Sequence, residues 1–161
     1  MKLSAHFDLS ELTHSATAAA RGIDNTPPPD VLANLEYRLV PILEEVRSVL
    51  GSHPLIITSG FRCHALNEAV GGAGSVAARR YDPNSKPSAH LFGLAADFVC
   101  PQAGSPFTIA QRLAGTPGLD FDQIINEQDS QGNMWVHIGV SADGQAARHM
   151  SFNAYQRTTA S

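Results

Sequence analysis

The segment Ser88–Phe98 reads SAHLFGLAADF and sets His90 and Asp97 in a run that is otherwise small or apolar. Its second half, continued to residue 100, has the composition of a strand. Because side chains alternate along a strand, Asp97 points to the same side as the small Ala95. A buried carboxylate is costly unless it is paired or bound to a metal ion. The segment therefore predicts a strand that carries a polar site.

A second polar residue interrupts the apolar run MWVHIGV (residues 134–140), where His137 lies in mid-strand with Trp135 on the same face. The preceding run FDQIINE (residues 121–127) also has a strand composition, and QDSQGN (residues 128–133) is a turn sequence between the two. These runs predict a β-hairpin, and a hairpin rules out an all-parallel sheet.

Two histidines and one aspartate in strand contexts match the ligand count of a catalytic zinc site, which has three protein ligands and one open position for water. Such a site lowers the pKa of the bound water to about 7. Each residue also has an ordinary structural explanation: His90 as a loop or capping residue, Asp97 in an ion pair, and His137 on a strand surface. The spacing alone leaves both interpretations open.

The clearest expected helix has Thr26 as its N-cap, Pro27 in its first turn and a stop at Gly51. Its apolar residues recur with a period of 3.6, and Pro41 should kink it. Shorter helices are expected within residues 7–15, 17–22, 64–72 and 105–116. Asp8 and Ser105 are the expected caps of the first and last, and Gly22 is the expected end of the second.

Three further segments complete the expected fold. PLIITSGFR (residues 54–62) predicts a buried strand, residues 72–89 a long polar loop, and residues 148–161 an edge strand followed by a frayed tail. The order of elements predicts an α+β fold, in which helices pack on one face of a mostly antiparallel sheet.

Length and composition narrow the function. A chain of 161 residues suits one domain, expected over residues 1–161, and a net charge of −4 provides no basic surface for nucleic acid. No run of 18 apolar residues predicts a membrane span, and the first 15 residues lack the apolar core of a secretory signal. We therefore expect synthesis in the cytoplasm, with Cys63 and Cys100 as reduced thiols and any contact between them left open.

The motif S-x-H-x-x-G-x-A-x-D (residues 88–97), followed by W-x-H (residues 135–137), resembles the zinc D-Ala-D-Ala carboxypeptidase family. That family includes vancomycin-resistance dipeptidases, cell-wall carboxypeptidases and phage endolysins of the L-alanyl-D-glutamate endopeptidase type, and it shares a fold with the hedgehog signalling domain. ITSGFR (residues 57–62) and ALNEAVGG (residues 65–72) are similar to two more of its elements.

The resemblance covers residues 7–141, which we take as the catalytic core, and leaves residues 142–161 as the edge strand and tail. TPPPDVLANL and FDQIINE are similar to segments of the compact phage and bacterial branch. The implied fold is hedgehog/DD-peptidase-like.

The resemblance also implies roles for single residues. His90, Asp97 and His137 would be the ligands of a Zn²⁺ ion. Arg62 would hold a substrate carboxylate or carbonyl beside the metal, for which a planar guanidinium is well suited. Ser88 and Trp135 would complete the substrate-binding residues, with the indole as one apolar wall.

One position departs from the family pattern. Several members carry an acidic residue three positions before the last histidine, and here that position is Met134, which cannot accept a proton. We expect Glu127, a cross-strand neighbour of His137 or Trp135, to act as the general base. An exposed hairpin position is the alternative for Glu127, and Asp120 and Asp122 are weaker candidates for the base.

Together these features predict a monomeric zinc metallopeptidase that hydrolyses peptidoglycan stem peptides, as an endolysin of the L-alanyl-D-glutamate endopeptidase type. It would act at the cell wall after release from the cytoplasm of the bacterial host, or be carried in a virion. The alternatives are a D-Ala-D-Ala carboxypeptidase or dipeptidase, and a non-catalytic zinc or cell-wall-binding module. Peptidoglycan stem peptides are the expected partners, and neither nucleic acid nor membrane is.

Overall fold

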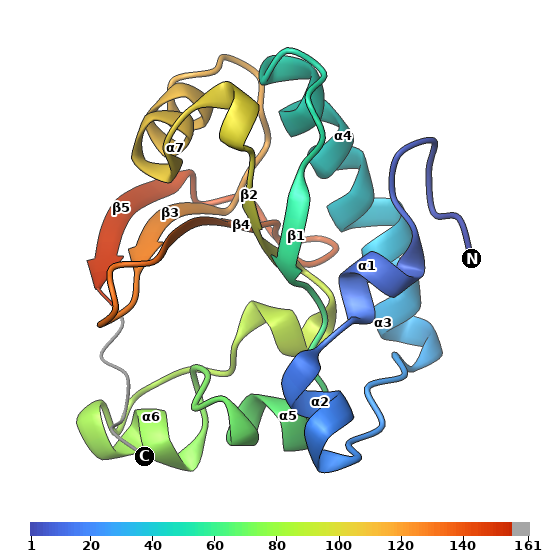
Figure 1. Ribbon diagram of the computed structural model, residues 1–161, viewed down its shortest axis with the longest axis vertical. Helices are drawn as coiled ribbons and strands as arrows, with labels where there is room; N and C mark the ends of the chain where they lie inside the picture. Colours follow the sequence, from blue (N-terminus) through green and yellow to red (C-terminus); the bar gives the residue numbers. More distant parts are fainter. Residues whose placement is uncertain (156–161) are drawn as a thin grey trace.

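A five-stranded sheet forms the centre of the fold in the computed structural model, which describes residues 1–155 (Figure 1). Its strands lie in the order β1-β2-β4-β3-β5. Their bounds are Ile56–Ser59 for β1, Ala95–Val99 for β2, Gln123–Gln128 for β3, Met134–Gly139 for β4 and Met150–Tyr155 for β5. All neighbours pair antiparallel except β3 and β5, which are parallel. The fold is thus α+β with a mixed sheet, and the predicted hairpin is β3–β4.

Seven α-helices surround this sheet among the described residues. They are α1 (Leu9–Thr13), α2 (Ala16–Arg21), α3 (Pro29–Asn34), α4 (Val40–Val49), α5 (His64–Ala69), α6 (Val76–Tyr81) and α7 (Pro106–Ala114). Figure 1 shows α4 and α7 on one side of the sheet, with α5 and α6 on the other. The main core lies on the side of α4 and α7, where Leu43 and Leu113 pack with Phe98 in one apolar cluster.

The expected caps of three helices are confirmed. Asp8 and Glu11 form a capping box at the start of α1, and the Ser105 hydroxyl accepts a hydrogen bond from the Thr108 amide at the start of α7. Gly22, with φ of 63°, ends α2. These local signals operate over three or four residues, which is why they could be predicted without the tertiary structure.

The expected start of the long helix at Thr26 and Pro27 is wrong. The helix begins at Pro29, and Pro28 is an extended N-cap with ψ of 163°. Proline disfavours the helical region for the residue before it, so the residues before Pro27, Pro28 and Pro29 favour an extended backbone. Pro29 is the first of the three prolines that is not followed by another, and it therefore opens α3.

At Pro41, where a kink was expected, the helix is irregular in the turn that precedes the proline. A π-helical turn, Leu35–Leu39, separates α3 from α4, and Pro41 lies in the first turn of α4. Proline has no amide hydrogen and its ring clashes with the carbonyl four residues earlier, here that of Tyr37. A widened turn of this kind accommodates such a local defect without ending the helix.

Two other expectations need correction. The strand β1 was expected to be buried, but it is the edge of the sheet, since only β2 pairs with it, and Ile56 is 52% exposed. The segment expected to be a polar loop contains α6, whose N-cap Ser75 accepts a hydrogen bond from the Ala78 amide.

At the other edge of the sheet, β5 confirms the predicted edge strand, while the expected frayed tail at 156–161 lies outside the described residues. Cys63 and Cys100 are both free thiols. None of the helices within residues 1–155 has the length and apolar character that a bilayer span requires.

Candidate metal centre

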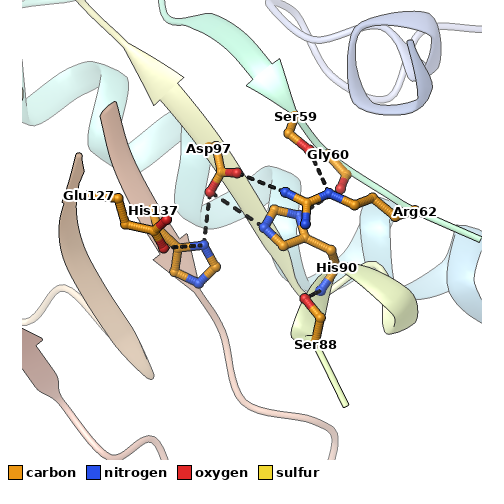
Figure 2. Close-up of polar contacts among 8 residues, drawn as sticks. All are labelled: Ser59, Gly60, Arg62, Ser88, His90, Asp97, Glu127 and His137. Atoms are coloured by element: carbon orange, nitrogen blue, oxygen red, sulfur yellow. Dashed lines mark hydrogen bonds and ion pairs between the residues drawn. The ribbon is translucent and has the colours of Figure 1, made fainter. Parts of the chain in front are cut away.

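The candidate site lies on the face of the sheet opposite the main core. Ala96 and Phe98 of β2 point into that core, so Asp97 between them points the other way. His137 of β4 is paired directly with Asp97 and shares its face. Figure 2 shows the two side chains converging, with the His137 Nδ1 atom 2.9 Å from the Asp97 Oδ1 atom.

His90 enters the site from a 3₁₀ turn, Ala89–Phe92, just before β2. The Ser88 hydroxyl begins this turn by accepting a hydrogen bond from the His90 amide. The His90 Nδ1 atom lies 2.7 Å from the Gly60 carbonyl oxygen. Because a carbonyl only accepts, Nδ1 carries the proton, and Nε2 presents a lone pair 3.4 Å from Asp97 Oδ1. This arrangement prepares His90 for metal binding through Nε2.

Gly93 of the S-x-H-x-x-G motif ends this turn in a conformation that glycine adopts without strain, with φ of 66°. A Cβ atom at this position would also lie 2.8 Å from the Val31 carbonyl oxygen. The glycine therefore allows the turn that carries His90 to lie directly against α3.

The three side chains together could hold a metal ion. His90, Asp97 and His137 each offer a ligand atom, these atoms lie within 4.8 Å of one another, and all three residues are buried. Two ligand atoms about 2.0–2.2 Å from a tetrahedral zinc ion lie roughly 3.3–3.6 Å apart, close to the 3.4 Å between His90 Nε2 and Asp97 Oδ1. Two imidazoles and a carboxylate are also a donor set that zinc accepts.

The lowered pKa values of Asp97 and His90 suit this role. Burial alone would raise the pKa of Asp97, but its polar contacts with His90 and His137 hold that pKa well below its usual range. Burial lowers the pKa of His90, while the hydrogen bond to Asp97 raises that of His137 against the opposing effect of burial. The carboxylate is thus ionised and His90 neutral, which are the states that bind metal.

Arg62 lies at the back of this cluster. Its Nη2 atom donates to Asp97 Oδ2 at 3.0 Å, and its Nε atom donates to the Ser59 hydroxyl at 2.9 Å (Figure 2). The sequence suggested that Arg62 holds substrate, and that role stays a prediction. The structure adds a contact that the sequence did not predict, since the guanidinium orients the second oxygen of a candidate metal ligand.

The ALNEAVGG segment packs against Arg62. A Cβ atom at Gly72 would lie 2.1 Å from Asn67 Oδ1 and 3.3 Å from Arg62 Nη1, so a larger residue there would displace the Asn67 side chain. Asn67 is buried and donates to the Ala73 carbonyl oxygen at 3.2 Å. The segment therefore packs beside the guanidinium of Arg62, and the glycines at its end allow this close approach.

Glu127 lies beside the cluster and is 8% exposed, so it is not the exposed hairpin residue that was the alternative. It is paired with Trp135, and its Oε1 atom is 3.9 Å from His137 Nδ1. Met134, at the position of the missing acid, is paired with Gln128 at the start of β4. Glu127 is thus an acidic residue within reach of the metal centre.

The rival acids are differently placed. Asp122 is held by Arg148, and the side chain of Asp120 is 79% exposed near His149. Trp135 is paired with Glu127 and shares its face, and its role as a wall of the site stays a prediction. No hydrogen bond partner is found for its buried Nε1 atom among the described residues.

Comparison with known families places this site in context. A family described as Peptidase M15 matches residues 5–139, which is most of the chain and includes every candidate site residue. The match ends at the last residue of β4, and β5 follows it. No curated protein sequence matches the chain.

Proposed function

The chain belongs to the peptidase M15 family, and from this premise we propose that it is an endopeptidase for the L-alanyl-D-glutamate bond of peptidoglycan stem peptides. The family and the buried cluster together support a metallopeptidase with zinc as its metal. The observation that carries the proposal is the convergence of His90, Asp97 and His137 on one buried face of the sheet. We propose these three as the zinc ligands, in a hedgehog/DD-peptidase-like fold.

Bound zinc would polarise the scissile carbonyl and lower the pKa of a water molecule to about 7. Glu127, close to His137, accepts the proton of the attacking water and passes it to the leaving amine. Arg62 keeps Asp97 in place through one N–H group and directs other N–H groups towards the substrate carbonyl. Trp135 and Ser88 line the bound peptide.

The surroundings of Arg62 favour an internal bond over a terminal one. A carboxypeptidase needs a cation that is available for the terminal carboxylate of its substrate. The Arg62 guanidinium already donates to Asp97 and Ser59, so its charge is partly neutralised by a carboxylate within the protein. An enzyme that meets a peptide carbonyl instead of a carboxylate has less need of a free cation.

Digestion of purified cell wall tests this proposal. Zinc-loaded protein should release peptides with a new D-glutamyl amino terminus, identified by mass spectrometry. Release of single D-alanine residues would instead identify a D-Ala-D-Ala carboxypeptidase. Bound zinc without any product would identify a non-catalytic zinc or wall-binding module. We propose that the protein acts on the wall as an endolysin, either after release from the cytoplasm of the bacterial host or from a virion.

The role of Glu127 has its own test. We expect Glu127→Gln to lower kcat by about 10²–10⁴-fold while zinc stays bound, since a general base contributes by that order. Glu45→Gln is the matched control, because Glu45 is exposed on α4 and the change in net charge is the same. Equal activity of the two variants would show that another group takes the proton.

A further inference from the structure

A continuous row of side chains leads from the metal centre to the edge of the sheet. His137 of β4 is paired with Ile125 of β3, and Ile125 is paired with Phe152 of β5. Directly paired residues project from the same face, so all three lie on the face of the candidate site. Neighbouring strands are about 4.8 Å apart, which puts the backbone of Phe152 roughly 10 Å from that of His137.

The row changes from polar to apolar along this path. His137 is buried in the cluster, Ile125 is buried beside it, and Phe152 is 42% exposed. Met150, on the same face two residues earlier in β5, is 40% exposed. We call Met150 and Phe152 the β5 platform. Exposed apolar side chains in continuity with a functional site are typical of ligand-binding surfaces.

The β5 platform is held firmly against the sheet. The Met150 amide donates to the Asp122 carbonyl oxygen at 3.0 Å, and the Arg148 Nε atom donates to the Asp122 carboxylate at 2.9 Å. On the opposite face, Asn126 donates to the Asn153 side chain at 3.2 Å. These contacts fix the register of β5, and therefore the position of the platform relative to the metal centre.

Building on the proposed function, we propose that the β5 platform binds the third residue on the carboxyl side of the cleaved bond. An extended peptide advances about 3.3 Å per residue, so roughly three residues span the 10 Å from the metal centre to Phe152. In a stem peptide cut after L-alanine, that third residue is a D-alanine, whose methyl group is apolar. The site is thereby suited to stem peptides instead of dipeptides. Because β5 follows the residues matched by the family, the platform is a feature of this chain beyond that match.

Phe152→Ala tests the proposal on two synthetic stem peptides with zinc-loaded protein. One peptide ends in D-alanine three residues beyond the cleaved bond, and the other lacks that residue. We expect Phe152→Ala to raise KM for the longer peptide by about fourfold, as for loss of one buried methyl contact. The kcat value should stay the same, since this contact is remote from the reacting bond and is made equally in ground and transition states. Neither constant should change for the shorter peptide, and Phe152→Leu should restore most of the loss.

Phe107→Ala is the matched control, because Phe107 is 41% exposed but lies on α7, which packs on the other face of the sheet. Equal KM and kcat values for the Phe107 and Phe152 variants on both peptides would contradict this role of the platform. An equal rise in KM of the Phe152 variant on both peptides would contradict it as well. If the wild-type protein cleaved neither peptide, the proposed function would fail and the platform with it. A wild-type dimer that Phe152→Ala converts to a monomer with unchanged kinetics would make the platform a self-association surface instead.

Discussion

Asp97 contacts both histidines and the arginine of the candidate centre. One carboxylate oxygen faces both His90 and His137, and the other accepts from Arg62. Since the side chain of Arg62 is only 17% exposed, this ion pair is protected from the screening that weakens surface pairs. Breaking such a pair leaves a buried charge without its partner, so the arginine matters even though it is not a ligand.

Arg62→Lys should weaken zinc binding by about 10–100-fold, the usual effect of losing a hydrogen bond to a metal ligand. A lysine has one nitrogen and cannot reproduce the planar fork that bonds Ser59 and Asp97 at once. Competition with a chelator of known affinity measures the change. Arg80→Lys, on the exposed α6, is the control, and equal zinc affinity in both variants would contradict this role for Arg62.

Gly72→Ala should destabilise the protein by about 1–3 kcal/mol, the range for overpacking a filled site. The new methyl group would overlap Asn67 Oδ1 and press on Arg62, so zinc affinity should fall as well. Denaturant unfolding and the chelator competition measure the two effects. Gly115→Ala is the control, since its nearest neighbour would be 3.5 Å away. Unchanged stability of the Gly72 variant would mean that the ALNEAVGG segment does not hold the guanidinium.

At the scale of elements, β5 depends on a charged contact at its start. Hydrogen bonds from Arg148 hold the pKa of Asp122 below its ordinary value of 3.8. A carboxyl group with a lowered folded pKa stabilises the fold above its unfolded pKa, and this contribution disappears as the pH falls through the lower folded value. Acid should therefore loosen β5 before it loosens the buried strands.

Hydrogen exchange of the β5 amides between pH 6 and pH 2, corrected for the intrinsic rates, checks this expectation. Protection at Phe152 should fall in the acid range in the wild-type protein. Asp122→Asn should lose this acid dependence, because it has no carboxyl group to titrate. Matching pH profiles in the two proteins would show that the Asp122–Arg148 contact does not secure the strand.

The elements predicted best were those with local causes. Asp8, Ser105 and Gly22 act on backbone groups within one turn, so their helices could be located from the sequence. The expected start of α3 at Thr26 and Pro27 was wrong because three successive prolines favour an extended backbone as far as Pro28. The edge position of β1 could not be predicted, since the same apolar run suits a central strand or an edge strand until its neighbours are known.

In the candidate site, the residue types could be predicted from the sequence, but their tertiary contacts could not. Sequence motifs identified His90, Asp97 and His137, and the structure brings these three side chains together. The proton acceptor for His90, which is the Gly60 carbonyl, could not be predicted because a backbone atom leaves no trace in residue type. The contact between Arg62 and Asp97 likewise depends on how β1 lies beside β2.

At the scale of the whole molecule, the centre joins parts of the chain that are far apart. A 3₁₀ turn supplies His90, β2 supplies Asp97 and β4 supplies His137, 40 residues further on. A metal ion bound by all three would therefore act as a crosslink that exists only in the folded protein. Any ligand that binds the native state alone stabilises it by mass action.

Zinc should accordingly raise the Tm, with about 2.7 kcal/mol of added stability when free zinc is 100 times its Kd. Calorimetry with free zinc held at about 100 times its Kd, compared with a chelator-treated sample, checks this. His137→Ala should remove the difference, whereas His64→Ala, at an exposed position on α5, should keep it. A wild-type Tm that is the same with zinc and with chelator would be inconsistent with a site built from distant segments.

Anomalous diffraction at the zinc edge, from crystals grown with one equivalent of zinc, tests the metal centre most directly. We predict one strong peak about 2.0–2.2 Å from His90 Nε2, from an Asp97 oxygen and from a ring nitrogen of His137. A peak held by other residues, or no peak among these three side chains, would contradict the assignment of this centre.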